Sequence, residues 1–164
     1  MNLYIFHTSS EASVYGIGTY IHELTTVLRH SGIKVCVVNL RAHKPQIQME
    51  ETSDGIKRWY FPEPMEQMET DHLCDLYYRN IVYLLQLYIE DKNNLIFHLN
   101  ANQSNVFARE LKKAFNCKIV LTIHYLDWCF KLSGNLTHFR ELCRNSETIQ
   151  RRKDIEYLKK DFQK

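Results

Sequence analysis

Apolar positions along the chain fall into short continuous runs separated by stretches with helical spacing. The run at 3–7 predicts a buried strand, and apolar residues then recur at helical spacing from Ile17 to Leu28. The next run, at 33–40, is rich in β-branched residues and indicates a strand that is covered on both faces. A strand, a helix and a strand in this order predict a parallel sheet.

The rest of the chain continues this alternation after one interruption. Segment 47–61 predicts two short strands around the turn pair Asp54-Gly55, and a charged helix is expected at the end of the chain. The other predicted elements are a helix at 71–92, a strand at 94–100, a helix at 104–115 and a strand at 117–124. We therefore predict an α/β fold, a Rossmann-like, doubly wound, mostly parallel sheet with helices on both faces and a small hairpin insertion, in one domain spanning 1–164.

Composition and charge exclude several function classes. The chain has 164 residues, of which 45% are hydrophobic and 24% charged, and its net charge of +2 gives no reason to expect a nucleic-acid partner. The apolar run at the N-terminus is too short for a signal peptide, and no basic residue precedes it. The five cysteines are an odd number without a C-x-x-C pair. We therefore expect reduced thiols, a cytoplasmic protein and no metal site.

Candidate binding residues follow three of the predicted strands. Ligands of such sheets bind outside the carboxyl ends of the strands, which directs attention to the glycine segment after the first strand, to Asn100, and to His124 with Asp127. The glycine segment holds Gly16 and Gly18, but Ile21 stands where a dinucleotide fingerprint has its third glycine, so NAD binding is disfavoured. Glycines beside a helix N-terminus let backbone N–H groups approach an anion, or they merely permit a tight entry into the helix, and both interpretations stay open.

Two longer stretches resemble the N-terminal half of retaining GT-B glycosyltransferases of family four. They are YGIGTYIHELTTVLRHSGIKVCVVN, at 15–39, and IFHLNANQSNVFARELKKAFNCKIVLTIHYLD, at 96–127. The resemblance extends over most of the chain, and its order and spacing match. This sequence departs from the family in two places: Gly16-Ile17-Gly18 replaces an adjacent glycine pair, and Asn100 stands where many relatives have a second histidine.

The resemblance implies the acceptor-side domain of a nucleotide-sugar-dependent retaining glycosyltransferase that acts in polysaccharide or glycoconjugate synthesis. It implies a UDP- or GDP-sugar donor, a C-terminal donor-binding domain in the same chain, a sugar or lipid-linked acceptor, and no cofactor. The family's donor motif has two glutamates eight positions apart, and no such pair occurs here. We therefore expect a chain truncated before its second domain and inactive alone. Many members of the family use lipid-linked acceptors, so peripheral contact of this protein with the inner face of the membrane is an open alternative.

The resemblance also implies roles for particular residues. His124 is the candidate catalytic residue, in contact with the donor sugar, and the histidine can instead hydrogen-bond near a strand end. The candidates for substrate or phosphate binding are Gly16, Ile17, Gly18, Thr19, His98, Asn100 and Asp127. For His98 a satisfied core histidine, and for Asp127 a helix-cap or loop role, are equally good interpretations. Three aromatic side chains are candidates for stacking on an acceptor sugar or for buried packing, namely Trp59, Trp128 and Phe130.

A second function class remains open beside the transferase. A stand-alone Rossmann-like module could bind a phosphorylated ligand or a protein partner without catalysis. A small NAD-linked oxidoreductase is the third interpretation, and Ile21 disfavours it.

Overall fold

The computed structural model describes residues 1–8, 16–53, 55–64, 71–100, 105–124, 135–137 and 140. The chain divides into two compact units, Met1–Thr122 and Ile123–Lys164. The sheet and the three helices described below all belong to the first unit. The charged helix predicted for the end of the chain lies outside the described residues.

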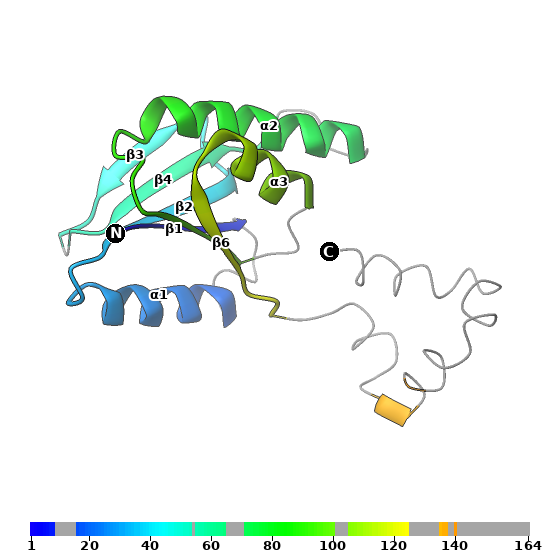
Figure 1. The fold of residues 1–164 in the computed structure, drawn as a ribbon, viewed down its shortest axis with the longest axis horizontal. Helices are drawn as coiled ribbons and strands as arrows, with labels where there is room; N and C mark the ends of the chain where they lie inside the picture. The colour runs from blue at the N-terminus through cyan, green and yellow to red at the C-terminus, as the bar shows by residue number, and fades with distance from the viewer. Residues whose placement is uncertain are drawn as a thin grey trace. The chain divides into compact units, whose positions relative to one another are not determined.

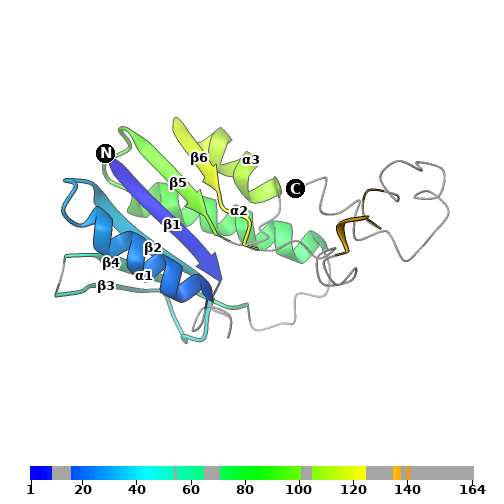
Figure 2. The same ribbon diagram turned by 90° about the horizontal axis from the view of Figure 1, so that it is seen from below.

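A six-stranded, mostly parallel sheet forms the centre of the first unit (Figure 2). The strands lie in the order β3-β4-β2-β1-β5-β6, and only the β3–β4 pair is antiparallel. This arrangement confirms both the predicted parallel sheet and the predicted hairpin. The strands are β1 (Asn2–Thr8), β2 (Lys34–Ala42), β3 (Gln48–Glu51), β4 (Lys57–Pro62), β5 (Leu95–Leu99) and β6 (Cys117–Leu121).

Helices cover both faces of this sheet, as predicted (Figure 1). Helix α1 (Gly16–Leu28) lies on one face, and helices α2 (Asp71–Tyr88) and α3 (Asn105–Ala114) lie on the other. Connections between parallel strands are right-handed, and the chain moves from β1 to β2 in one direction and from β5 to β6 in the opposite one. The helices of these two connections therefore lie on opposite faces, which makes the fold doubly wound. No helix in the described part of the chain is both long and apolar enough to cross a membrane.

The larger core lies between the sheet and the helices α2 and α3. The Phe6 ring meets the rings of Phe97 and Phe107 edge to face, with centroids 5.6 and 5.3 Å apart. Such pairs add to the hydrophobic stabilisation that comes from burial. Leu85 of α2 and Leu111 of α3 are fully buried in the same cluster. The aromatic side chains thus fix both helices to one face of the sheet.

A smaller core lies under α1. Leu3 and Ile5 of β1 and Val35 and Val37 of β2 pack with Ile21 of α1. Side chains alternate between the two faces along each strand, so these residues leave the intervening positions to the larger core. The position of α1 is therefore set by the apolar residues in the first halves of β1 and β2.

Three predicted boundaries were wrong. Helical spacing was expected only from Ile17 onward, with Gly16 in the preceding loop, but α1 begins at Gly16 itself. The strand expected to reach His124 ends at Leu121, and the helix expected to reach Lys92 ends at Tyr88. Helix and strand ends depend on capping groups and pairing partners, and apolar spacing does not register these.

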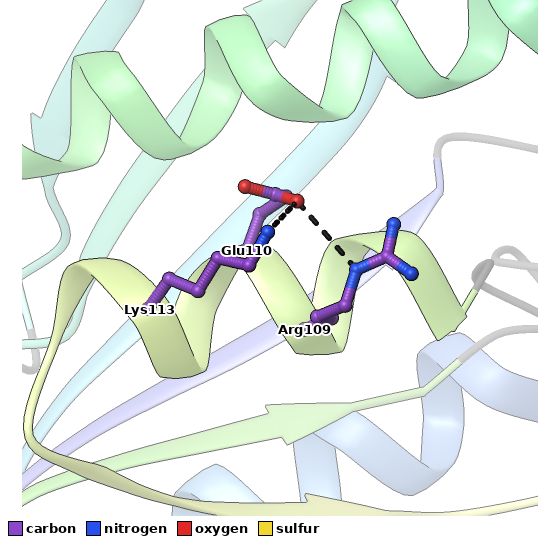
Figure 3. Close-up of polar contacts among 3 residues, drawn as sticks. All are labelled: Arg109, Glu110 and Lys113. Atoms are coloured by element: carbon purple, nitrogen blue, oxygen red, sulfur yellow. Dashed lines mark hydrogen bonds and ion pairs between the residues drawn. The ribbon is translucent and has the colours of Figure 1, made fainter.

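Polar contacts lie along the second half of α3 (Figure 3). Glu110 accepts a hydrogen bond from Lys113 Nζ at 2.9 Å and lies 3.6 Å from Arg109 Nε. Lys112 Nζ donates to the carbonyl oxygen of Cys117 at 2.5 Å, which joins the end of the helix to the start of β6. Two lysines in the last turn also match the negative end of the helix dipole.

Candidate functional site

The side chains that face α1 change from apolar to polar toward the carboxyl ends of the strands. On β1 the face runs from Ile5 to His7, and on β2 it runs from Val37 to Asn39. Arg58 of β4 pairs in register with Val37 and shares this face. The apolar layer under α1 therefore gives way to nitrogen-bearing side chains.

These side chains surround a pocket between α1 and the sheet. Its volume is about 210 Å³, and we call it the α1 pocket. In the described part of the chain, the sheet contributes one lining residue from each of three strands, and the helix contributes three. The lining residues are His7, Asn39, Arg58, Gly18, Ile21 and His22.

His7 lies buried in the wall of the α1 pocket. Its Nδ1 lies 3.3 Å from the carbonyl oxygen of Thr8, and since a carbonyl oxygen only accepts, Nδ1 is the donor. Burial lowers the pKa of His7 below its ordinary value, and the positive charge of Arg58 acts in the same direction. Hydrogen bonds with Thr8 and Asn39 oppose this shift. The imidazole is therefore neutral at neutral pH, with the hydrogen on Nδ1.

Asn39 and Arg58 complete the sheet side of the pocket. The Nδ2 amide of Asn39 donates to the carbonyl oxygen of Trp59 at 3.3 Å, which fixes the buried side chain. Arg58 is half-buried and forms no ion pair with any other residue that the structure describes. Its cross-strand neighbour Glu50 instead accepts a 2.6 Å hydrogen bond from the Tyr60 hydroxyl. Arg58 thus lines the pocket, and its guanidinium has no carboxylate partner in the described part of the chain.

The four candidates in the glycine segment all lie in the first turn of α1. Gly16, Ile17 and Gly18 are the first three residues of α1, whose N–H groups have no acceptor within the helix, and Thr19 follows them. Of these, Gly18 lines the α1 pocket. The absence of a side chain at Gly18 lets the backbone itself form part of the wall.

The candidates His98 and Asn100 lie at the end of β5 and are buried. His98 Nε2 is 2.7 Å from the hydroxyl of Thr122, and its ring meets that of Tyr20 edge to face at 6.3 Å. The backbone N–H of Asn100 donates to the carbonyl oxygen of Phe6 at 2.9 Å. His98 thus links β5 both to α1 and to the residue after β6. Neither side chain is in the lining of the α1 pocket.

The remaining predicted residues have no described place beside this pocket. His124 is exposed and belongs to the second unit, so its distance from the α1 pocket is not defined. Asp127, Trp128 and Phe130 lie outside the described residues. Trp59 is buried on the opposite face of the sheet, between Tyr4 and Tyr88, at ring-centroid distances of 5.5 and 6.2 Å.

Sequence reasoning missed four residues of the pocket: His7, His22, Asn39 and Arg58. A partial signal exists for two of them, because a polar residue interrupts the α1-facing side of an apolar run at His7 and at Asn39. Arg58 lies on the α1-facing side of the sheet because β4 pairs with β2, and no local sequence pattern predicts this pairing.

A larger hollow of about 490 Å³ opens at the other end of the sheet. Its wall includes Lys34 and Lys57, the first residues of β2 and β4. In doubly wound sheets the ligand lies at the carboxyl ends, so the α1 pocket is the better candidate. Among the described residues, no group of three His, Cys, Asp or Glu side chains is placed to hold a metal ion.

Comparisons with known proteins support the fold. No protein-family model and no curated protein matches this chain. Among solved structures, the sucrose-phosphate synthase from Thermosynechococcus elongatus is similar, with a TM-score of 0.63 and 13% sequence identity. The match covers 84% of this chain and 36% of the synthase chain, so the present chain spans about a third of that protein. The first unit therefore has a Rossmann-like α/β fold of the GT-B kind.

Proposed function

We propose that this chain is the acceptor-side domain of a nucleotide-sugar-dependent retaining glycosyltransferase in polysaccharide or glycoconjugate synthesis. One observation supports this most: a GT-B-like sheet has a polar pocket under the first turn of α1. That turn holds the glycines on which the resemblance to family four depends. The pocket also lies toward the carboxyl ends of the strands, where ligands of such sheets bind.

The proposed reaction needs a second domain. A UDP- or GDP-sugar would bind mainly to a C-terminal domain of the same chain, and a sugar or lipid-linked acceptor would bind here, at the cytoplasmic side of a membrane. The bond from the anomeric carbon to the diphosphate breaks, and the diphosphate leaves with the electron pair. The oxygen of an acceptor hydroxyl forms the new bond to that carbon, and the hydroxyl proton passes to the leaving diphosphate. Positive groups and N–H dipoles that face the leaving diphosphate lower the barrier. His124 is the candidate for contact with the donor sugar.

A stand-alone module that binds a phosphorylated ligand is the second candidate. It is favoured by Arg58, whose guanidinium faces the α1 pocket without an ion-pair partner among the described residues. Such a module would bind its ligand and release no nucleotide from any sugar donor.

A donor screen separates the two candidates. The full-length protein is incubated with UDP- and GDP-sugars, with and without a mixture of sugar acceptors, and free UDP or GDP is measured. We expect one donor to give acceptor-stimulated nucleotide release and residues 1–164 alone to give none. Full-length protein that is folded but releases nucleotide from no donor would favour the binding module.

A further inference from the structure

We propose that the α1 pocket binds the dianion of a phosphate monoester, with Arg58 as its main anchor. Such binding would occur whether or not the protein transfers sugar, so it goes beyond the glycosyltransferase function. Four side chains define the site: Arg58 of β4, His7 of β1, Asn39 of β2 and His22 of α1.

The distribution of the nitrogen-bearing residues around the pocket favours a tetrahedral anion. A planar carboxylate is satisfied by one guanidinium fork, whereas a phosphate monoester presents three terminal oxygens that point apart. Arg58, Asn39 and His22 carry nitrogen-bearing side chains on two strands and a helix, so donors can approach from several sides, and His7 would add its Nε2 as a donor only when it is protonated. Gly18 adds a backbone N–H in the first turn of α1, at the positive end of the helix dipole.

The charge of the pocket favours an anion as well. Among the residues that the structure describes, its lining contains one arginine and two histidines and no carboxylate. The nearest cross-strand carboxylate, Glu50, is engaged by the Tyr60 hydroxyl. Arg58 also lies close enough to His7 to lower the pKa of that histidine, and a bound dianion would act in the opposite direction and raise it.

The size of the pocket limits what can enter. Sites for drug-sized ligands have volumes of about 300–1,000 Å³, and the α1 pocket has about 210 Å³. It can hold a phosphoryl group and the atoms next to it, but not a complete nucleotide. The phosphate could come from a sugar phosphate, from a nucleotide or from free phosphate, and the titration below distinguishes these sources.

The test is a titration of the full chain with glucose 6-phosphate, glucose, UDP and inorganic phosphate, followed by calorimetry and by the imidazole NMR signals of His7 and His22. We expect glucose 6-phosphate to bind and to shift both imidazoles, and glucose not to bind. Arg58→Gln should weaken the binding of glucose 6-phosphate by about tenfold or more. Arg58→Lys should give an intermediate loss, because it keeps the charge and loses the fork.

The matched control is Lys57→Gln, which removes the same charge from the neighbouring residue on β4. Lys57 lines the large hollow on the other face and not the α1 pocket, so its loss should leave binding unchanged. Thermal unfolding of each variant shows that it is folded. An equal loss in Arg58→Gln and Lys57→Gln, or no binding of glucose 6-phosphate to the original chain, would overturn the site. Binding of UDP without binding of glucose 6-phosphate would likewise overturn the phosphate-monoester site, and it would leave the proposed sugar transfer standing.

Discussion

At the scale of single residues, His7 makes the stability of the fold depend on pH. Its pKa in the folded protein lies below the ordinary value, mainly because of burial, and Arg58 adds to this effect. His22 and Asn39 also face it from α1 and β2. The unfolded chain therefore takes up a proton at a higher pH than the folded one does, and the free energy of unfolding falls as the pH drops through about 6.5.

Replacing His7 by Gln removes this titration. We expect the unfolding free energy of His7→Gln to change less than that of the original protein between about pH 7.5 and about pH 5.5. Urea unfolding of both proteins at both pH values measures these changes. The other histidines are present in both proteins, so their contribution cancels when the two changes are compared. Identical pH dependence in the two proteins would show that the pKa of His7 is the same in both states.

The contact between His98 and Thr122 decides between two interpretations of His98. Thr122→Val removes a hydroxyl that lies 2.7 Å from a buried imidazole nitrogen, and we expect it to destabilise the fold by about 1–3 kcal/mol. Thr122→Ser keeps the hydroxyl and should cost less than half as much. Chemical denaturation measures both. If both variants are equally stable, the contact contributes nothing and a core role for His98 loses its support.

At the scale of elements, helix α2 offers a matched test of the larger core. Leu85 is 0% exposed and Leu87 is 61% exposed on the same helix. Leu85→Ala should destabilise the protein by about 2–5 kcal/mol, because it leaves a cavity. Leu87→Ala should change stability by no more than about 0.5 kcal/mol. Urea unfolding of both variants provides the comparison, and similar losses would contradict the packing of α2 on the sheet.

The elements also show how far the sequence alone could predict the fold. Local apolar spacing located every strand and helix of the first unit, including the hairpin around Gly55, whose φ is +79°. It did not predict that α1 starts at Gly16 or that β6 ends at Leu121. Capping groups and strand-pairing partners set these ends, and apolar spacing does not register them. It could not find the α1 pocket, because Arg58 reaches His7 only through the pairing of distant strands. The alternation of side chains along a strand shows which residues share a face. The pairing of strands that are distant in sequence decides which of the two faces packs against which helix.

At the scale of the whole molecule, the GT-B-like fold makes His124 a residue to test in the full-length protein. A sugar bound by a second domain could accept a hydrogen bond from this exposed imidazole. We expect His124→Ala to lower turnover by about 10- to 100-fold, as the loss of one hydrogen bond of about 1–3 kcal/mol implies. Its melting temperature should stay close to that of the original protein. A lower melting temperature with normal turnover would indicate a purely structural role.

The most direct test of the transferase account is the product itself. The full-length protein is supplied with the donor found in the nucleotide-release screen and with an acceptor, and NMR follows the anomeric proton of the transferred sugar. Retaining transfer predicts a new glycosidic signal with the anomeric configuration of the donor. A product with the inverted configuration would contradict the retaining mechanism, and folded protein that forms no glycosidic product would contradict sugar transfer altogether.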